Sequence, residues 1–495
     1  MIKNLPTGVI LLSLLLIGIF SCQTLEFEDP ENLEINYSLD TLTFDTVFTQ
    51  VGSTTRYFKI YNRGDKFARL QEVKLNNPES KFRINVDGRQ GPSVSDVEIP
   101  PHDSIYVFVE VTVDPDQPIS ASPFIIEEHL SILRGNSDDQ VTLTAWGQNA
   151  NYIPSLQSKD RQALITCDFG KWTWDDPKPY VIYGVLVIDS CDLEIPAGTR
   201  VYVHGGLVQN NETSYQDGVL FIGKNASIRT LGTAENPVTF QTDRLEEEYQ
   251  ERLGQWGRIH LAPESKNNSF SYTHILHSQF GVYVDSLAEL ELDHSIVGFN
   301  SYFGIYGFRA NVKAENCLFH TSGGYNLRTA LGGQYDFKHC TFANIGYGQE
   351  AVLLSNFYCY DQNPQPGSCE NGLVSRLNAH FENSILYSSK SDALILNNAI
   401  LDEPSYFQVE FEHSIIRARD LTEDGAYPDF FEDYPTTIQY HFGDALFKDE
   451  NEYNFALDSL SIAKNQADLI PEITDDILGN SRGTTPDIGA YEFID

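Results

Sequence analysis

The second half of the chain repeats itself, and this repetition constrains the fold more than any other feature of the sequence. Six segments share an apolar residue followed, two positions later, by a histidine or an asparagine. The column of these residues consists of His274, His294, Asn316, His339, Asn383 and His413. Successive members lie 20, 22, 23, 44 and 30 residues apart. We interpret the 44-residue interval as two repeats, one of which carries an inserted loop.

A repeat of about 22 residues with three short strands predicts a right-handed parallel β-helix. Each repeat then forms one rung, and rungs stack about 4.8 Å apart, so that equivalent residues form ladders along the axis. The His/Asn column resembles the asparagine ladder that such folds carry at a tight turn. Because its members stack along the axis and do not converge on a point, we expect no metal ion there, and no CxxC or His-rich spacing indicates zinc.

Several motifs resemble bacterial pectate-lyase-like β-helix repeat proteins. The opening coils are matched by Leu193-Glu194-Ile195-Pro196-Ala197-Gly198-Thr199, by residues 228–240 and by Trp256-Gly257-Arg258-Ile259, and the closing coil by residues 479–492. The resemblance covers roughly residues 170–495 and implies the fold. It implies no activity, because this superfold hosts lyases, hydrolases, esterases, adhesins and enzymatically silent proteins. We assign residues 151–495 to the β-helix with its closing coil.

Residues 33–150 show a different rhythm, with short alternating strands about ten residues apart, for example 56–61, 104–111 and 141–145. Alternation with a period of two predicts half-buried strands, and this spacing is typical of an antiparallel β-sandwich. The segment also resembles bacterial immunoglobulin-like modules of the Hydin type, through Asn62-Arg63-Gly64 and the closing Thr144-Ala145-Trp146-Gly147. Such modules space or dock partners. The predicted fold class is therefore all-β, an immunoglobulin-like sandwich followed by a β-helix.

The first 22 residues have the features of an export signal. Lys3 precedes an apolar stretch at 9–20, which is too short for an ordinary transmembrane helix. Ile19-Phe20-Ser21-Cys22 resembles the lipobox of bacterial lipoproteins, which implies lipidation of Cys22 and a tether over residues 23–32. We expect an exported protein, lipid-anchored to the cell envelope at the outer membrane. A plain secretory signal cleaved elsewhere is the alternative.

An exported protein resides where disulfides form. Cys359 and Cys369 flank a loop of turn residues and are predicted to form a disulfide, and Cys167 with Cys191 is a second candidate pair. Cys317 and Cys340 occupy a column that otherwise carries serine, so we interpret them as stacked, buried free thiols. A disulfide between these two rungs is the alternative.

One face of the predicted β-helix carries the candidate ligand site. Alternation sends Ile259, Val282, Ile305 and Ile395 inward. It sends outward a row of His260, Tyr283, Tyr306 and Asn326, and beside it a second row of Asp285, Phe308 and Arg328. Aromatic faces interleaved with hydrogen-bonding groups are what sugar rings need. Further along, Val352, Leu354, Leu394 and Leu396 are predicted to lie outward under the 358–374 loop.

The formal charge of −37 makes the chain a poor candidate for binding nucleic acid or an anionic membrane surface, because both need a positive field, so we expect no nucleic-acid partner. Three functions remain: binding of an extended polysaccharide or envelope adhesion, a polysaccharide lyase or hydrolase that uses His260, Tyr283, Asp285 and Arg328, and a purely structural role. Family signatures of polygalacturonases and pectate lyases are absent. Asp285 and Arg328 are predicted two rungs apart, about 10 Å, which suits binding better than acid–base catalysis. Catalytic residues stay unassigned, no cofactor is required, and Ca²⁺ association is compatible with the acidic composition.

Overall fold

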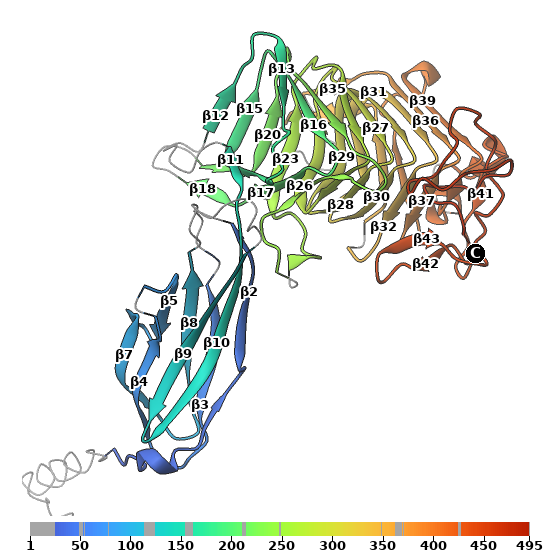
Figure 1. Cartoon of the computed structure of the whole chain (residues 1–495). Coiled ribbons are helices and arrows are strands. Elements are labelled where there is room, and N and C mark those ends of the chain that lie inside the picture. The colour runs from blue at the N-terminus through green and yellow to red at the C-terminus, as the bar shows by residue number, and fades with distance from the viewer. Residues whose placement is uncertain are drawn as a thin grey trace, which may run out of the picture. The chain divides into compact units, whose positions relative to one another are not determined.

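The computed structural model describes residues 25–48, 53, 55–77, 79–112, 124–153, 162–209, 214–246, 249–347, 349–361, 369, 371–423 and 427–494. Cys22 and the rest of the expected export signal lie outside these residues. Within the described ranges, no helix has both the length and the apolar character needed to cross a membrane. The chain divides into two compact units, Met1–Asn149 and Ala150–Asp495 (Figure 1).

The first unit is a β-sandwich of two five-stranded sheets. One sheet has the order β1 (Ile35–Tyr37), β3 (Arg56–Asn62), β8 (Ser104–Val111), β5 (Phe82–Val86) and β6 (Arg89–Gly91). The other has the order β2 (Thr41–Phe48), β10 (Ser137–Gln148), β9 (Phe124–Arg134), β4 (Ala68–Leu75) and β7 (Ser93–Ile99). A short 3₁₀ helix, η1 (Pro30–Asn32), precedes β1. The three predicted strands lie in β3, β8 and β10, and their inward residues Phe58, Val107 and Leu143 are fully buried between the sheets.

The second unit is a parallel β-helix with three faces. Face 1 consists of β12 (Gln162–Ile165), β15 (Val185–Ile188), β20 (Val219–Ile222), β23 (Trp256–Leu261), β26 (Ser278–Val284), the first halves of β29 (Phe303–Glu315) and β31 (Leu327–Lys338), β33 (Val352–Ser355) and β38 (Leu394–Asn397). Face 2 consists of β13 (Gly170–Thr173), β16 (Cys191–Pro196), β21 (Ser227–Leu231), β24 (Asn268–Ser271), β27 (Glu289–Asp293), the second halves of β29 and β31, β36 (Leu377–Glu382) and β39 (Phe407–Glu412).

Face 3 is an eleven-stranded sheet. Its strands are β11 (Asn151–Ile153), β14 (Tyr180–Tyr183), β17 (Arg200–His204), β22 (Val238–Thr242), β25 (Thr273–Leu276), β28 (Ile296–Asn300), β30 (Leu318–Ser322), β32 (Thr341–Asn344), β37 (Ile385–Ser388), β40 (Ile415–Ile416) and β41 (Ile438–Gln439). Three hairpins leave the coil: β18 (Leu207–Gln209) with β19 (Ser214–Gln216), β34 (Phe357–Cys359) with β35 (Gly372–Val374), and β42 (Phe447–Asp449) with β43 (Asn454–Leu457). Short helices η4 (Pro404–Tyr406), α2 (Asp420–Glu423) and α3 (Phe430–Asp433) follow late in the chain.

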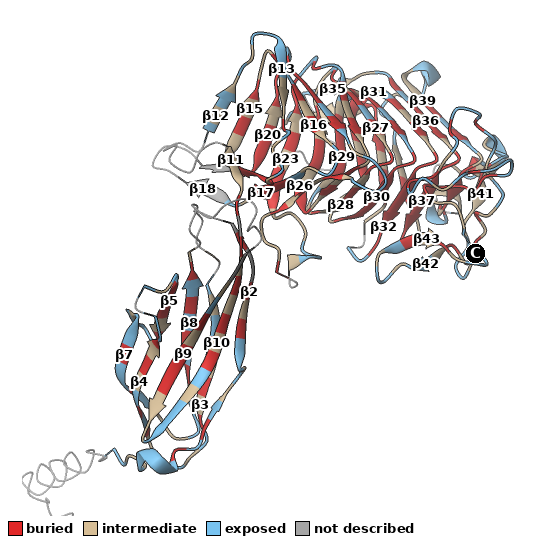
Figure 2. Ribbon diagram, viewed as in Figure 1, coloured by how far each residue is buried: buried red, intermediate tan, exposed pale blue. Residues whose placement is uncertain are grey.

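Buried residues recur on strand after strand of the β-helix (Figure 2). They form one apolar cluster that fills its interior. The predicted inward residues Ile259, Val282 and Ile305 pair in register on neighbouring strands and are fully buried. Aromatic side chains stack in the same way: the ring centroids of Phe337 and Phe381 lie 5.1 Å apart at an interplanar angle of 22°. This continuous apolar core confirms the predicted β-helix.

The ladder at the turn between faces 2 and 3 differs from the prediction in one member. Its residues have positive φ, a conformation that asparagine and histidine tolerate better than most residues. Tyr272 (φ 42°) takes the place predicted for His274, and its ring stacks on His294 at 4.4 Å. His274 instead lies within β25 and pairs with Ile296. The motif pattern was matched two residues too late at this rung, because a tyrosine was not expected in the turn.

The 44-residue interval is one rung and not two. Lys338 pairs directly with Glu382, and Asn383 Nδ2 donates a hydrogen bond to His339 Nε2 at 3.0 Å. The extra residues form the β34–β35 hairpin and its flanks, between β33 and β36. The two-rung interpretation was therefore wrong, because an insertion between faces 1 and 2 lengthens the sequence without adding a rung.

The residue after each ladder position forms a column of small side chains, and the serines of this column accept hydrogen bonds from backbone amides of the preceding rung. Thr273 N donates to Ser295 Oγ at 3.1 Å, and Cys340 N donates to Ser384 Oγ at 3.2 Å. Cys317 and Cys340 lie in this column as buried free thiols. Cys167 and Cys191 form a disulfide between the first rungs.

The outward side of face 3 is covered by the last part of the chain. Leu318, Ile385 and Ile415 point outward from this face and are buried in a cluster with Leu446 and Ile488. The residues from 461 to 493, called the closing segment below, also bind the ladder: Asp468 N donates to Asn383 Oδ1 at 2.8 Å. The chain thus covers its own apolar surface on face 3.

Candidate functional site on the outward side of face 1

Strand pairing defines the outward row of face 1. His260 pairs with Tyr283, Tyr283 with Tyr306, and Tyr306 with Arg328. The row extends back through Phe221 and Val187 to Leu164, and forward through Leu353 to Ile395. The structure thus brings together four of the seven predicted ligand-face residues in a single line across four strands.

Asn326 does not belong to this row. It is fully buried, and its Nδ2 donates a hydrogen bond to Phe319 O at 2.9 Å. Matching the repeats of the sequence placed Asn326 beside Tyr306, but Arg328 occupies that position. Asn326 lies at the corner between faces 3 and 1, before β31 begins. Its side chain is bonded to β30 of face 3, so it contributes nothing to the outward surface.

The prediction for the next two strands was wrong by one residue. Val352, Leu354 and Leu394 are fully or almost fully buried in the core, and Leu396 packs partly buried against it, while Leu353 and Ile395 face outward. A shift of one residue exchanges the two sides of a strand. No outward apolar patch of the predicted residues therefore exists, and the hairpin is not needed to cover one.

An aromatic band surrounds the row. It consists of Phe221, His260, Phe280, Tyr283, Tyr302, Phe303, Tyr306 and Tyr325. Tyr283 and Tyr306 have ring centroids 4.8 Å apart, and the rings of Phe303 and Tyr306 stack at 5.5 Å. Tyr302 is 51% exposed, whereas Tyr306 is only 7% exposed under its neighbours. The sequence analysis missed Phe280 and Phe303, because they lie three residues before Tyr283 and Tyr306 and strict alternation would send them inward; the irregular register before Val282 brings them beside the row.

Two arginines lie at the edges of this band. The guanidinium carbon of Arg328 is 5.0 Å from the centroid of Phe303 and 5.8 Å from that of Tyr306. That of Arg258 is 6.0 Å from Phe280 and 5.8 Å from Tyr283. Arg258 was not predicted, although it precedes His260 by two residues and therefore points to the same side.

A chain of hydrogen bonds fixes the histidine of the row. Arg258 Nε donates to His260 Nδ1 at 3.3 Å, so His260 carries its proton on Nε2 and donates to Asp285 Oδ2 at 3.4 Å. Burial opposes ionisation of Asp285, but the hydrogen bonds from His260 and from the Ser286 amide outweigh it and hold the pKa of this carboxyl below its usual value. Burial also raises the pKa of Tyr283, and that of Tyr306 to about 12, so both phenols stay neutral.

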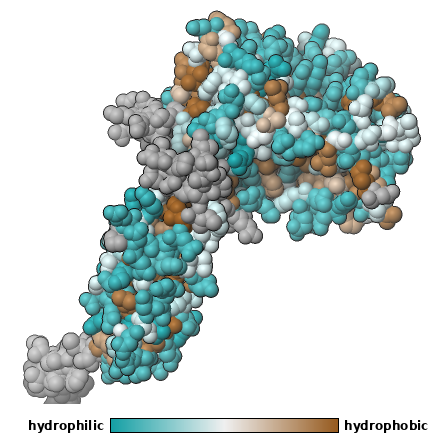
Figure 3. Space-filling view, in the orientation of Figure 1, coloured by the Kyte–Doolittle hydropathy of each residue, from teal (hydrophilic) through white to brown (hydrophobic). Residues whose placement is uncertain are grey.

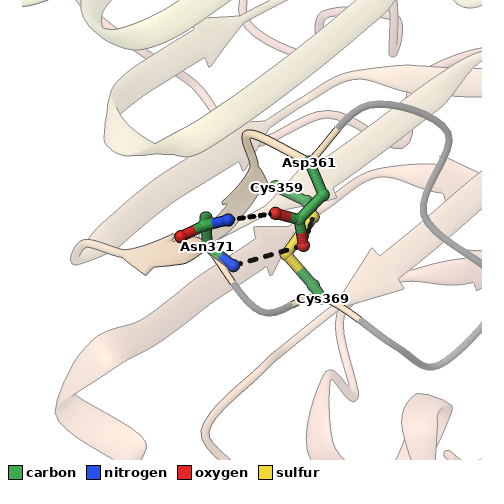
Figure 4. Close-up of a disulfide and its surroundings, with 4 residues drawn as sticks. All are labelled: Cys359, Asp361, Cys369 and Asn371. Carbon is green, nitrogen blue, oxygen red and sulfur yellow. Dashed lines mark hydrogen bonds between the residues drawn. A yellow bond between two sulfur atoms is a disulfide. The ribbon is translucent and has the colours of Figure 1, made fainter.

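The β34–β35 hairpin lies beside the remaining predicted residue, Phe308. Tyr358 meets Phe308 edge to face at 5.0 Å and Tyr360 at 4.8 Å, and Tyr360 is 53% exposed. Cys359 and Cys369 are bonded to each other, and Asp361 accepts hydrogen bonds from the backbone and side-chain nitrogens of Asn371 (Figure 4). These links hold the base of the hairpin; residues 362–368 and 370 lie outside the described residues.

The groups on the outward side of face 1 are suited to contacts with a ligand. The segments of the described strands that make up face 1 contain no aspartate or glutamate; Asp285, just after β26, is the nearest carboxyl to the row and is already paired with His260. Hydrolysis of a glycosidic bond ordinarily needs two carboxyl groups about 5–9.5 Å apart. The row and the aromatic band around it offer aromatic faces, phenol hydroxyls and the guanidiniums of Arg328 and Arg258, which suit stacking and hydrogen bonding to an extended ligand.

Two groups of metal-ligating residues occur among the described residues, and neither lies in the aromatic band. In the first, Cys359 and Cys369 are disulfide-bonded and offer no thiolate. In the second, on face 2, His380 Nδ1 bonds Asp336 at 3.0 Å and its Nε2 lies 3.5 Å from Glu412. The hydrogen bond that His380 Nδ1 donates to the Asp336 carboxylate raises the pKa of His380. These contacts satisfy the imidazole by ion pairing without a metal ion.

A hollow of about 710 Å³ lies on the first unit. Its lining includes Phe108, Asn85, Gln90 and Glu110 on the outer side of the sheet that contains β8. Tyr57 is next to Phe108, with ring centroids 5.9 Å apart. This surface is separate from face 1 and was not singled out by the sequence.

No protein-family model and no curated protein matches the chain. Among solved structures, it is similar to a protein of unknown function from Porphyromonas gingivalis W83, with 19% identity over 26% of this chain and 51% of that chain, at a TM-score of 0.18. It is also similar to the catalytic unit of a GH87 α-1,3-glucanase from Streptomyces thermodiastaticus strain HF3-3 (9% identity, 72% and 73% covered, TM-score 0.26) and to XylC with xylose (9%, 91% and 89%, 0.22).

The match spans about half the length of the Porphyromonas protein. TM-scores this low do not establish a common fold, so the assignment of a parallel β-helix rests on the strand pairing of this chain itself.

Proposed function

We propose that this protein binds an extended glycan along the outward row of face 1. The observation that carries the proposal is the aromatic band. In it, Tyr283 and Tyr306 lie side by side on neighbouring strands, and their hydroxyls and two arginines lie close to the rings. Sugar rings stack their C–H faces on aromatic rings and satisfy their hydroxyls with fixed polar groups. A row that runs across neighbouring strands matches the shape of a polymer lying along the axis of the β-helix.

Binding without turnover is favoured over catalysis. The segments of the described strands on face 1 hold no pair of carboxyl groups, and the one histidine of the row has both ring nitrogens engaged. The enzyme alternative predicts that ultraviolet absorbance or reducing ends rise when the protein is incubated with its glycan. We expect neither to rise.

Affinity electrophoresis of the full chain through glycan-containing gels tests the proposal. Tyr302→Ala removes the most exposed ring of the band, and Tyr283→Ala removes a ring of the row itself. Tyr347→Ala is the matched control, because Tyr347 is 45% exposed and follows β32 on face 3. We expect both band variants to lose most of the retardation, since a lost stacking contact costs about 1 kcal/mol or more, while the control keeps it. Equal retardation of all three would contradict the assignment.

The proposal includes the site of action. The protein is anchored through a lipid on Cys22 to the cell envelope, and the first unit acts as a spacer. Growth of the source cells with a labelled fatty acid is expected to label the wild-type chain and not Cys22→Ala. Labelling of both, or of neither, would remove the anchor from the proposal without affecting face 1.

A further inference from the structure

Arg258 and Arg328 are cations without an acidic partner. Among the described residues, no carboxylate oxygen lies within 4 Å of either guanidinium, although the chain has 70 aspartates and glutamates against 33 lysines and arginines. The Nε of Arg328 is buried and has no hydrogen-bond partner in the described part of the chain. A half-buried guanidinium left unpaired is costly, so each arginine needs a reason to remain in this position.

Other arginines show what a satisfied guanidinium looks like in this protein. Arg482 donates to Glu492 Oε1 at 2.8 Å, and Arg134 Nε donates to Asp139 Oδ2 at 2.8 Å. Arg258 has only the imidazole of His260 as a hydrogen-bond partner, and burial lowers the pKa of Arg258. The sides of the two arginines that face the band are occupied by aromatic rings, which attract a cation but do not neutralise its charge.

The surrounding charge makes this arrangement selective. With a net charge of −37, the molecule repels polyanions at a distance, so nonspecific ionic adsorption is disfavoured. The part of the surface seen in Figure 3 is mostly hydrophilic, with hydrophobic side chains in separate patches. An anion therefore gains only where a local, desolvated cation is presented together with rings on which a sugar can stack.

We infer that the glycan bound on face 1 is anionic, and that Arg258 and Arg328 each bind a carboxylate or sulfate group of it. The inference rests on the proposed function. The two arginines lie on β23 and β31, three strand steps apart, which corresponds to about 14 Å along the axis. The ligand thus carries anionic groups at about this repeat, with neutral ring surface between them over the aromatic band.

The test is to probe a glycan array with the full chain. The array holds neutral, carboxylated and sulfated forms of the same polysaccharide backbones. One series is dextran, carboxymethyl dextran and dextran sulfate, and the other is hydroxyethyl cellulose, carboxymethyl cellulose and cellulose sulfate. We expect at least one charged form to be bound tenfold or more tightly than its neutral parent. The carboxylated and sulfated arms distinguish the two anionic groups.

The variants Arg328→Gln and Arg258→Gln are each expected to lose at least fivefold in affinity for the charged form and less than that for the neutral form, because glutamine keeps a hydrogen-bond donor but removes the charge. Arg229→Gln is the matched control, because it removes the same charge from an exposed position on face 2, and we expect less than a twofold change. Melting temperatures of all three variants identify any that fail to fold.

The outcomes separate the two levels of the proposal. Equal binding of neutral and charged forms, unchanged in the arginine variants, overturns the inference and leaves glycan binding standing. Charged forms bound equally well by wild type and both variants overturn the assignment of the arginines. No binding to any member of the array overturns the proposed function and the inference with it.

Discussion

Replacing Arg482 by methionine removes the group that ties the closing segment to the ladder. The Arg482 side chain is almost fully buried, and its guanidinium donates to Asn316 Oδ1, Glu492 Oε1 and the backbone carbonyls of Asp475, Asp487 and Gly489. Methionine fills much of the volume but supplies no donor. The carboxyl of Glu492, half-buried and with its pKa raised to about 7 by burial, loses its cation. Removing one partner of a buried ion pair costs about 3–5 kcal/mol of unfolding free energy.

Equilibrium unfolding in urea, followed by tryptophan fluorescence and far-ultraviolet circular dichroism, measures this loss. Glu492→Gln is the milder companion, because its amide oxygen still accepts from Arg482, and we expect it to lose about 1 kcal/mol. Arg229→Met, at an exposed site, is expected to stay within about 0.5 kcal/mol of wild type. A loss below about 1 kcal/mol for Arg482→Met would refute the view that this guanidinium joins the closing segment to the β-helix.

Three further predictions concern the stability and shape of the β-helix. Burial lowers the pKa of His320 to about 3, so between pH 3 and 6.5 the folded state binds fewer protons than the unfolded state, and the free energy of unfolding falls as the pH falls. The loss attributable to His320 is about 2 kcal/mol at pH 5. His320→Phe should therefore flatten the dependence of unfolding free energy on pH, measured by urea titration. Ser384→Ala leaves Cys340 N without its acceptor and is expected to cost about 1–3 kcal/mol, whereas Ser384→Cys, which restores a sulfur acceptor, should cost less in the same titration. The double change Cys359→Ser and Cys369→Ser frees the hairpin that holds Tyr358, so glycan retardation should weaken while the melting temperature of the main transition changes little; an unchanged retardation would show that the hairpin takes no part in binding.

The architecture could be predicted from the sequence because the stacked rungs of a β-helix require a recurring pattern of apolar residues. Inward residues such as Ile259, Val282 and Ile305 must stack at equal depth, so the apolar pattern recurs with every rung. Insertions obscure this period. The β34–β35 hairpin lengthened one interval to 44 residues, and the sequence has no mark that distinguishes an inserted hairpin from a second rung.

The candidate site could be predicted only where the sequence determines the register between neighbouring strands of face 1. His260, Tyr283 and Tyr306 lie in strands whose position in the repeat is clear from the sequence, and they pair with one another as predicted. Asn326 was misplaced because a corner residue leaves the alternation of the strand, which only backbone geometry determines. The missing partner of Arg328 is also invisible in the sequence, because it depends on which acidic residues the fold brings near.

The measurement that tests the account most directly is binding of residues 23–495 to a broad glycan array, with the Tyr283→Ala and Tyr302→Ala variants screened beside the wild type. The account predicts a specific polysaccharide signal for the wild type that falls at least fivefold in both variants, with Tyr347→Ala unchanged. An array blank for the wild type, or a signal that survives both substitutions, would contradict glycan binding on face 1.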